Sequence, residues 1–367
     1  MTKVILLATS DLVTDQRVYR TALSLHNAGY YVVAVGRCFS YTPSDFCSPF
    51  SIKYLKIPIV KGFFFYALFN ISAFFYLIFC RFDVIQANDL DTLPAAWLAG
   101  KLKRKPIVYD SHELFTEVPE LIQRPRVKRF WGWLEKRLVI GLKYCSTVSE
   151  GVANELKNRY GIHFRVIRNL PLAKTASNNY QLDSRTIIYQ GALNLGRGIE
   201  RLIAAMQFIH DSKLLIAGMG DIEDMLKNIT NKLGLKNKVS FLGRVPHHDL
   251  HDITCKATIG VSLEEDMGLN YRFALPNKLF DYIQAGLPVL VSDLPEMKRT
   301  VEQFCIGTTI TSDCNAYALA QKLNVILDNT KQLNLWHENS LKAARELIWE
   351  KEEPVLLELF NNALKNK

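Results

Sequence analysis

The sequence predicts an α/β protein with two doubly wound domains in tandem, and three observations lead to that prediction. The chain has 367 residues, more than a single hydrophobic core usually organises. Short apolar runs alternate with helix-like segments in both halves, an order typical of a mainly parallel sheet covered by helices on both faces. Between Leu170 and Ser184 a polar stretch with few apolar residues interrupts the alternation, as expected of a linker.

The apolar runs are short and nearly uninterrupted, which is typical of strands buried on both faces. In the first half we expect strands at residues 4–8, 31–35, 52–55, 84–87, 107–109 and 146–148. In the second half we expect them at residues 187–190, 214–217, 239–242, 259–262 and 289–292. A helix with apolar residues at helical spacing follows the first strand, over residues 15–28, and ends before Gly29.

These elements define a first domain over residues 1–172, a linker over 173–184 and a second domain over 185–348. Residues 349–367 have a helical pattern, and we expect this last helix to return to the first domain. Two such domains that face each other leave a central cleft between the carboxyl ends of their strands, where open parallel sheets bind ligands.

The formal charge of +9 belongs entirely to the first half of the chain. Residues 1–180 hold 24 Lys and Arg against 13 Asp and Glu, whereas residues 181–367 hold 21 against 23. A basic half indicates an anionic partner such as a membrane surface, a lipid-linked phosphate or a nucleic acid. The basic residues follow no nucleic-acid-binding motif, so we expect no nucleic acid partner.

Two segments of the basic half have the composition of helices that contact membranes. Residues 62–79 are almost entirely apolar, but Asn70 interrupts them and they lie between two strands of one sheet. We therefore expect a crossover helix there and not a membrane span. Residues 124–137 mix six Lys and Arg with one Phe and two Trp, as interfacial helices do. The alternative is a basic amphipathic helix that buries its aromatic side chains in the core.

The seven cysteines form no Cys-x-x-Cys pair and no zinc-ligand spacing with histidine, so we expect reduced thiols in a cytoplasmic protein. Residues 1–8 are a short apolar run without the long apolar stretch and cleavage site of a signal peptide, and we expect them to form the first strand. With its basic first half, the protein is expected in the cytoplasm, including the inner face of the cell membrane.

The most informative segment is residues 275–292, LPNKLFDYIQAGLPVLVS. Its Pro-Asn start suits a helix N-terminus, where free N–H groups and the helix dipole favour a phosphate. Lys278 in the first turn adds a positive charge, and Asp281, one turn further, is placed to accept hydrogen bonds from a ribose diol. A well-capped helix with both side chains solvated fits the same pattern.

This segment resembles the donor-binding signature P-N-K-L-F-E-Y of the retaining GT-B glycosyltransferases, in the nucleotide-sugar enzymes called glycosyl transferases group 1, or family 4. Three more segments are similar in the order that family has them: DQRVYR at residues 15–20, DVIQANDLDTLP at 83–94 and VYDSHEL at 108–114. Arg197-Gly198, after a predicted strand, resembles the family's phosphate loop. The matches span nearly the whole chain and imply the GT-B fold, two Rossmann-like domains that face a central cleft.

The resemblance assigns the second domain to the nucleotide-sugar donor and the first domain to the acceptor. It implies that Lys278 and Arg197 contact the donor diphosphate, that Asp281 holds the ribose, and that His112 lies near the transferred sugar. The expected catalytic residues are therefore His112, Arg197 and Lys278. The expected donor site consists of Gly191, Arg197, Gly218, Gly220, Gly243, Arg244, Asn270, Tyr271, Asn277, Lys278 and Asp281. The expected acceptor side consists of Asp11, Asp15, Asn88 and Asp89.

Several positions depart from the family's pattern. Gln86 and Asn88 stand where it has two histidines, Ala192 stands where it often has an arginine, and Phe273 falls where its E-x7-E pair has the first Glu. The acidic run at residues 264–266 is expected to be a solvated loop, with binding of acceptor hydroxyls as the alternative.

No metal ion or other cofactor is expected. Asp89 and Asp91 have the spacing of a metal-binding Asp-x-Asp pair, but they fall at a predicted helix start, where Asp89 is expected to be the cap. Arg197, Lys278 and a helix N-terminus would then neutralise the leaving nucleoside diphosphate, as Mg²⁺ does in other phosphate sites.

We therefore expect a retaining, metal-independent glycosyltransferase that moves a hexosyl or N-acetylhexosaminyl group from a nucleotide-sugar to a lipid-linked or saccharide acceptor, in cell-surface polysaccharide or glycolipid synthesis. Two alternatives remain open. A nucleotide-sugar 2-epimerase of related architecture would turn over its substrate without an acceptor. A non-catalytic nucleotide-sugar-binding protein at the membrane would bind the donor without transferring its sugar.

Overall fold

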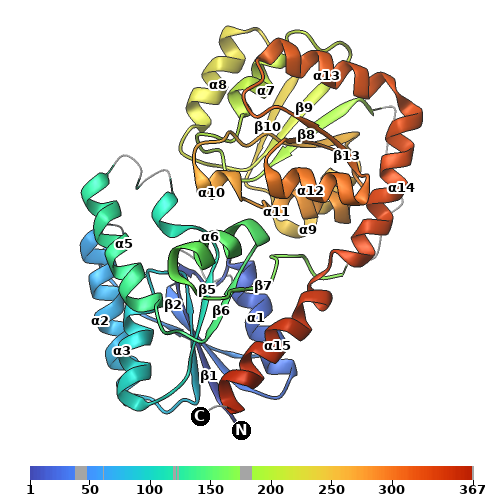
Figure 1. Ribbon diagram of the computed structural model, residues 1–367. Helices are drawn as coiled ribbons and strands as arrows, with labels where there is room; N and C mark the ends of the chain where they lie inside the picture. Colours follow the sequence, from blue (N-terminus) through green and yellow to red (C-terminus); the bar gives the residue numbers. More distant parts are fainter. Residues whose placement is uncertain (38–47, 61, 119–120, 122–123, 174–183, 366–367) are drawn as a thin grey trace. The chain divides into compact units, whose positions relative to one another are not determined.

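The computed structural model describes residues 1–37, 48–60, 62–118, 121, 124–173 and 184–365. The chain divides into two compact units, and each unit is built on its own parallel sheet (Figure 1). Unit 1 comprises Met1–Asn169 and Glu352–Lys367, and unit 2 comprises Leu170–Lys351. Most of the predicted linker, residues 174–183, lies outside the described residues.

Unit 1 is organised around a seven-stranded sheet with the order β3-β2-β1-β4-β5-β6-β7, in which all neighbours are parallel. The strands are β1 (Lys3–Asp11), β2 (Tyr31–Arg37), β3 (Ser51–Tyr54), β4 (Val84–Asn88), β5 (Ile107–Ser111), β6 (Tyr144–Thr147) and β7 (Arg165–Val166). The middle of β1 and all of β4 and β5 are buried, as their uninterrupted apolar runs predict.

Helices cover both faces of this sheet. They are α1 (Gln16–Asn27), α2 (Phe63–Phe79), α3 (Leu93–Lys103), the short 3-10 helix η1 (Phe115–Glu117), α5 (Pro125–Val139), α6 (Glu150–Tyr160) and most of α15 (Trp349–Lys365). In Figure 1, α2, α3 and α5 lie along one flank of the sheet, and α1 and α15 lie along the other.

Helix α2 joins β3 to β4 within one sheet, which confirms the prediction of a crossover helix over residues 62–79. Among the residues that the structure describes, none of the helices combines the length and the apolarity needed to cross a membrane. The polar interruption of α2 has a structural reason. The side chain of Asn70 donates to the backbone oxygen of Asp91 (2.7 Å) and accepts from the N–H of Ala95 (3.0 Å), so it fixes the start of α3.

Unit 2 has a six-stranded sheet with the order β10-β9-β8-β11-β12-β13, again parallel throughout. The strands are β8 (Thr186–Gln190), β9 (Lys213–Ala217), β10 (Val239–Gly243), β11 (Ile259–Ser262), β12 (Val289–Ser292) and β13 (Gly307–Ile310). The first five confirm the strands expected in the second half of the chain. The edge strand β13 was not predicted, because its sequence GTTI contains no apolar run. Its four residues are only half-buried in the structure.

The helices of unit 2 form two layers. They are α7 (Ile199–Ala205), α8 (Glu223–Lys232), α9 (His247–Cys255), α10 (Leu269–Arg272), α11 (Asn277–Gln284), α12 (Pro295–Phe304), α13 (Ala316–Asp328) and α14 (Thr330–Glu346). Helices α7, α8 and α13 share one apolar cluster with the sheet, and α11 and α12 share a second cluster. Helices on both faces of an all-parallel sheet, in both units, confirm the predicted fold class.

The last helix, α15, contributes a buried apolar stripe to unit 1. Leu356, Phe360 and Ala363 are all at most 3% exposed. The buried carboxylate of Glu352 anchors the start of the stripe, since it accepts from Nε (2.8 Å), Nη2 (2.6 Å) and the backbone N–H (2.9 Å) of Arg168. Residues 352–365 therefore complete the fold of unit 1 from the far end of the chain.

Candidate functional site

Each sheet reverses its strand order once, between β1 and β4 in unit 1 and between β8 and β11 in unit 2. At such a reversal the connections from two neighbouring strands run to opposite faces of the sheet, and the crevice between them at the carboxyl ends binds ligands in open parallel sheets. Charged side chains gather at both reversals.

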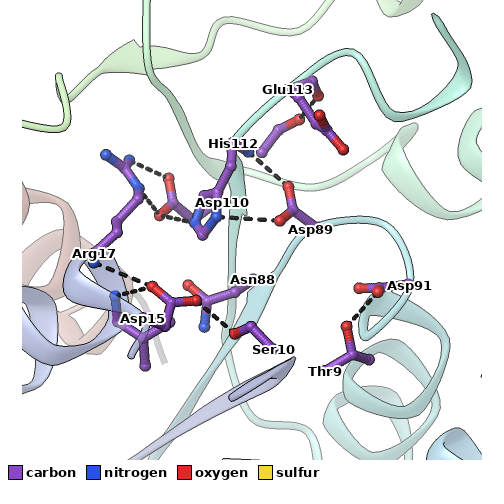
Figure 2. Close-up of polar contacts among 12 residues, drawn as sticks. Thr9, Ser10, Asp15, Arg17, Asn88, Asp89, Asp91, Asp110, His112 and Glu113 are labelled. Atoms are coloured by element: carbon purple, nitrogen blue, oxygen red, sulfur yellow. Dashed lines mark hydrogen bonds and ion pairs between the residues drawn. The ribbon is translucent and has the colours of Figure 1, made fainter. Parts of the chain in front are cut away.

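In unit 1 the imidazole of His112 lies between two carboxylates (Figure 2). Its Nδ1 is 3.1 Å from Oδ2 of Asp89, its Nε2 is 3.0 Å from Oδ2 of Asp110, and its backbone N–H donates to Oδ1 of Asp89 (2.7 Å). Burial opposes the charge of the ring, but the two carboxylates outweigh burial and hold the pKa of His112 well above 6.5. His112 is therefore a fixed imidazolium at neutral pH, and neither ring nitrogen is free to accept a proton.

Asp110 is held in turn by Arg17 from α1. Nε of Arg17 donates to Oδ2 (2.8 Å) and Nη2 donates to Oδ1 (2.7 Å), while the hydroxyl of Ser146 also donates to Oδ1 (2.8 Å). Burial alone would raise the pKa of Asp110, but Arg17 and His112 hold it well below its usual range. The carboxylate stays ionised and fixes the orientation of the imidazolium.

The residues expected on the acceptor side occupy different environments. Asp15 is the N-cap of α1: its carboxylate accepts from two backbone N–H groups of the first turn and from the hydroxyl of Ser10. Asn88 is buried, and its amide donates to the backbone oxygen of Leu7 (2.8 Å), so it stabilises the join between β4 and β1. Asp11, at the end of β1, is partly exposed and accepts from the N–H of Val13 (3.1 Å) within a turn.

Asp89 does not cap the following helix, so that prediction is wrong. The cap position of α3 is Thr92, whereas Asp89 has a left-handed backbone conformation (φ 62°) that directs its carboxylate to His112 (Figure 2). Asp91 takes a different partner, the hydroxyl of Thr9, and burial together with the nearby charge of Asp89 raises the pKa of Asp91 to about 7. The two carboxylates of the Asp-x-Asp pair therefore serve separate contacts.

In unit 2 the carboxylate of Glu264 brings two cations together. Nζ of Lys278 is 3.0 Å and Nη1 of Arg197 is 3.5 Å from the same oxygen, Oε1, and the hydroxyl of Ser262 donates to Oε2 (2.7 Å). The expectation of a solvated acidic run is wrong for Glu264, which directly follows the buried strand β11 and is 0% exposed. Burial would raise the pKa of Glu264, but Lys278 and Arg197 lower it below 4.5.

Both cations also lie over aromatic rings. Nζ of Lys278 is 4.0 Å from the ring centroid of Tyr189, and the guanidinium of Arg197 is 5.0 Å from that of Tyr271. The tyrosine hydroxyls donate to backbone oxygens, Tyr189 to Ala192 (2.8 Å) and Tyr271 to Leu195 (3.0 Å), which fixes the rings. Two cations that share one counter-charge in a preformed setting are suited to a diphosphate.

The glycines of the expected donor site allow loops to approach closely. A Cβ on Gly218 would lie 1.8 Å from the backbone oxygen of Gly191, and a Cβ on Gly220 would lie 2.4 Å from that of Leu193. Gly191 itself has a φ of 130°, and a Cβ there would lie 3.3 Å from Cε of Lys278. The loops after β8 and β9 therefore touch only because these positions lack side chains.

The remaining expected donor residues follow the same strand ends. Asp281, on α11, accepts from Nε2 of Gln190 at the end of β8 (3.0 Å), and the side-chain oxygen of Gln190 accepts from the hydroxyl of Thr254 (2.9 Å). Gly243 ends β10 and the exposed Arg244 follows it. Asn270 lies on α10, and the exposed Asn277 begins α11.

The structure thus brings Arg197, Lys278 and Tyr271 together in unit 2, and it places His112 in unit 1. Sequence reasoning missed the roles of Glu264, Asp110 and Arg17 in holding these groups. The last two lie inside the motifs that carried the family resemblance, and Glu264 could have been found from its position directly after a buried strand.

Two Rossmann-like parallel sheets, each with charged residues at its strand-order reversal, define the class of two-domain α/β proteins with GT-B architecture. Residues 15–170 match the family model "Glycosyltransferase Family 4", and residues 173–343 match "Glycosyl transferases group 1". The chain therefore belongs to the group 1 glycosyltransferases, as the sequence motifs implied.

Individual proteins are also similar to this chain. A curated relative, an uncharacterized glycosyltransferase from Methanocaldococcus jannaschii, is 36% identical over 127 residues, and the match covers 33% of this chain and 30% of that protein. The sucrose-phosphate synthase of Thermosynechococcus elongatus superposes with a TM-score of 0.81 at 17% identity, over 100% of both chains. Anabaena HepE, solved in complex with UDP-glucose, gives 0.73 at 15% identity, over 99% of this chain and 100% of the other. These structures confirm the GT-B fold.

Proposed function

We propose that the protein is a retaining glycosyltransferase that moves a hexosyl or N-acetylhexosaminyl group from a nucleotide-sugar donor to a lipid-linked or saccharide acceptor. The observation that carries the proposal is the pair of cations, Lys278 and Arg197, held by one oxygen of Glu264 at the strand-order reversal of unit 2. Family membership supports sugar transfer, and the UDP-glucose bound to Anabaena HepE supports a nucleotide-sugar donor.

The donor diphosphate would replace Glu264 as the counter-charge of Lys278 and Arg197. The two cations can be no further apart than the sum of their distances to the shared oxygen, 3.0 and 3.5 Å, which suits two neighbouring phosphates. The N-terminus of α11, with Asn277, adds backbone N–H groups. Asp281 would hold the ribose, with Gln190 orienting its carboxylate, and Gly243 and Arg244 would lie near the nucleobase. These groups neutralise the leaving diphosphate in our proposal without a metal ion.

His112 would act as a fixed positive charge near the transferred sugar. A general base needs a free lone pair, and both ring nitrogens of His112 donate to carboxylates. We therefore propose that the leaving diphosphate accepts the proton of the acceptor hydroxyl. This transfer requires the hydroxyl to attack the sugar from the face that the diphosphate leaves. Attack on that face retains the anomeric configuration.

Unit 1 would receive the acceptor, with Asp11, Asp15, Asn88 and Asp89 near it, in the synthesis of a cell-surface polysaccharide or glycolipid at the inner face of the membrane. The basic excess of residues 1–180 supports an acceptor that carries phosphate or lies among anionic lipids.

The test is turnover of a panel of nucleotide-sugars by the wild type and by Lys278→Ala, with a membrane lipid extract as the acceptor source. We expect the variant to lose about 100-fold or more in nucleoside diphosphate release, because one preorganised charge contact at a leaving group contributes about 2.7–4 kcal/mol. Lys232→Ala, an exposed lysine of α8, is the matched control and should keep full activity.

The same experiment separates the alternatives. Unchanged turnover in Lys278→Ala would contradict the assigned site. Conversion of the nucleotide-sugar to an epimer without acceptor would identify an epimerase, and donor binding without any turnover would identify a non-catalytic protein. An NMR assignment of the anomeric carbon in the product tests retention, and inversion would contradict the front-face mechanism.

A further inference from the structure

We infer that α2 and α5 of unit 1 present one continuous face that lies on an anionic membrane surface, and this rests on the proposed function, which brings the acceptor to a membrane. Four exposed aromatic rings define the centre of this aromatic face. Phe63 packs against Phe64 (centroids 5.7 Å apart) and against Phe130 of α5 (6.3 Å), and Phe130 packs against Trp133 (6.3 Å). All four side chains are between 43% and 69% exposed. Contiguous exposed apolar side chains of this kind mark interaction surfaces.

Helix α5 carries the aromatic face on one side and core contacts on another. Trp131 is buried, and its ring centroid lies 5.4 Å from that of Tyr66 and 5.0 Å from that of Phe115. Among the aromatic residues of α5, Trp131 is therefore the one that packs in the core. Phe130 and Trp133 point outward instead. The expected alternative, a basic helix that buries its aromatic side chains, therefore holds for Trp131 only.

The exposed aromatic residues of α5 lie in a stripe with arginines at both ends. Arg126, Phe130, Trp133 and Arg137 follow one another at spacings of four, three and four, which places them along one side of the helix. Both arginines are exposed. A stripe of this pattern resembles helices that lie in the plane of a bilayer interface, with rings in the headgroup layer and cations at the phosphates.

Helix α2 extends the apolar surface because it carries two apolar stripes where the core requires one. Phe65, Phe69, Ala73 and Leu77 recur every four residues and are buried against the sheet and its helices. Ile71, Phe75 and Phe79 also recur every four residues, and they are 53–84% exposed. The core stripe accounts for the packing of α2 in unit 1, so the second stripe is available to an apolar partner.

The charge around the aromatic face selects an anionic lipid surface. Residues 124–137 contain six Lys and Arg, of which Lys128 pairs with Glu117 (2.7 Å). The one acid of this segment, Glu135, is buried and accepts from the hydroxyl of Tyr160 (2.7 Å). At the end of the neighbouring helix α3, Lys101 and Arg104 are exposed too. A second copy of the chain fits this face poorly, because a symmetric dimer would place like charges against each other.

The experiment is co-sedimentation of the full chain with phosphatidylcholine vesicles and with vesicles that also contain phosphatidylglycerol, at low and high salt. We expect binding to the anionic vesicles only, weakened by salt. Arg126→Gln with Arg137→Gln should weaken binding about fivefold for each charge removed. Phe130→Ser with Trp133→Ser should abolish the binding that survives at high salt, where the apolar contribution remains.

Matched controls come from exposed residues of unit 2. Lys232→Gln with Lys236→Gln, and Val325→Ser with Leu335→Ser, should bind like the wild type. Circular dichroism confirms that each variant is folded, and nucleotide-sugar turnover with a water-soluble acceptor should be unchanged in all of them.

Absence of binding by the folded wild type to anionic vesicles would overturn the inference, as would equal losses in the control variants. A dimer in sedimentation velocity that Phe130→Ser with Trp133→Ser dissociates, without vesicle binding, would identify a self-association surface and overturn it too. Vesicle binding by a protein that turns over no nucleotide-sugar would uphold the aromatic face and contradict the proposed function.

Discussion

The charged residues at the two strand-order reversals balance in opposite ways. In unit 1, Arg17 and His112 face Asp89 and Asp110, and the carboxylate of Asp15 also lies close enough to act on Arg17, so these five groups carry one negative charge in excess. In unit 2, Lys278 and Arg197 share the single carboxylate of Glu264, so these three groups carry one positive charge in excess. An anionic ligand therefore gains most in unit 2, and the carboxylates of unit 1 are suited to accept hydrogen bonds from the hydroxyl groups of a sugar.

The protonation of His112 gives a pH prediction at the same scale. Because the folded-state pKa of His112 is raised, the stability that its charge contributes is fully present below 6.5 and is lost as the pH rises through the raised value. Asp89→Asn keeps an acceptor for the backbone N–H of His112 but removes one of the two carboxylates. We expect the folded-state pKa of His112 to be lower in this variant than in the wild type, so that the loss of stability begins closer to neutral pH.

The measurement is an NMR titration of the His112 ring protons, together with urea unfolding as a function of pH. Asp328→Asn, which removes an exposed carboxylate of unit 2, is the matched control and should leave the His112 titration unchanged. Equal titration midpoints for His112 in the wild type and in Asp89→Asn would contradict its placement between two carboxylates.

At the scale of elements, apolar runs and the residues that interrupt them predicted most of the strands but few of the loop conformations. Strands with a continuous apolar run, such as β4 and β11, were found within a residue of their observed bounds. β7 has two residues, and β13 has no apolar run, so neither has a period to detect. The left-handed turn at Asp89 is set by the contact with His112, which lies 23 positions further along the chain, and local sequence carries no sign of it.

Helix α15 supports a stability prediction for unit 1. Phe360 is fully buried although it lies seven residues from the end of the chain, and its side chain completes the core that α15 covers. Phe360→Ala should lower the free energy of unfolding by about 3–5 kcal/mol, the usual loss for a buried phenylalanine. Urea unfolding followed by circular dichroism measures it, with Lys365→Ala on the exposed side of the same helix as the control. An unchanged midpoint for Phe360→Ala would mean that α15 is not part of the unit 1 core.

For the whole molecule, the two-domain architecture and the family followed from the sequence, because periodicity and ordered motifs are properties of the chain alone. The pairing of Lys278 and Arg197 with Glu264 did not follow, because it depends on how two strand ends and the start of a helix meet. Glu264 follows β11, Arg197 lies between β8 and α7, and Lys278 lies in the first turn of α11, so the three side chains meet only in the folded unit. From the acidic run at residues 264–266 alone, we expected Glu264 to lie in a solvated loop.

The central claim is that unit 2 binds the diphosphate of a nucleotide-sugar through Lys278. The most direct test is thermal unfolding of the wild type and of Lys278→Ala with UDP, GDP, ADP, CMP and dTDP and their sugars. A ligand that binds only the folded state at about 100 Kd stabilises it by about 2.7 kcal/mol, so at least one of these nucleotides should raise the melting temperature of the wild type. The shift should vanish in Lys278→Ala and persist in Lys232→Ala. No shift with any nucleotide, or an equal shift in Lys278→Ala, would contradict the claim.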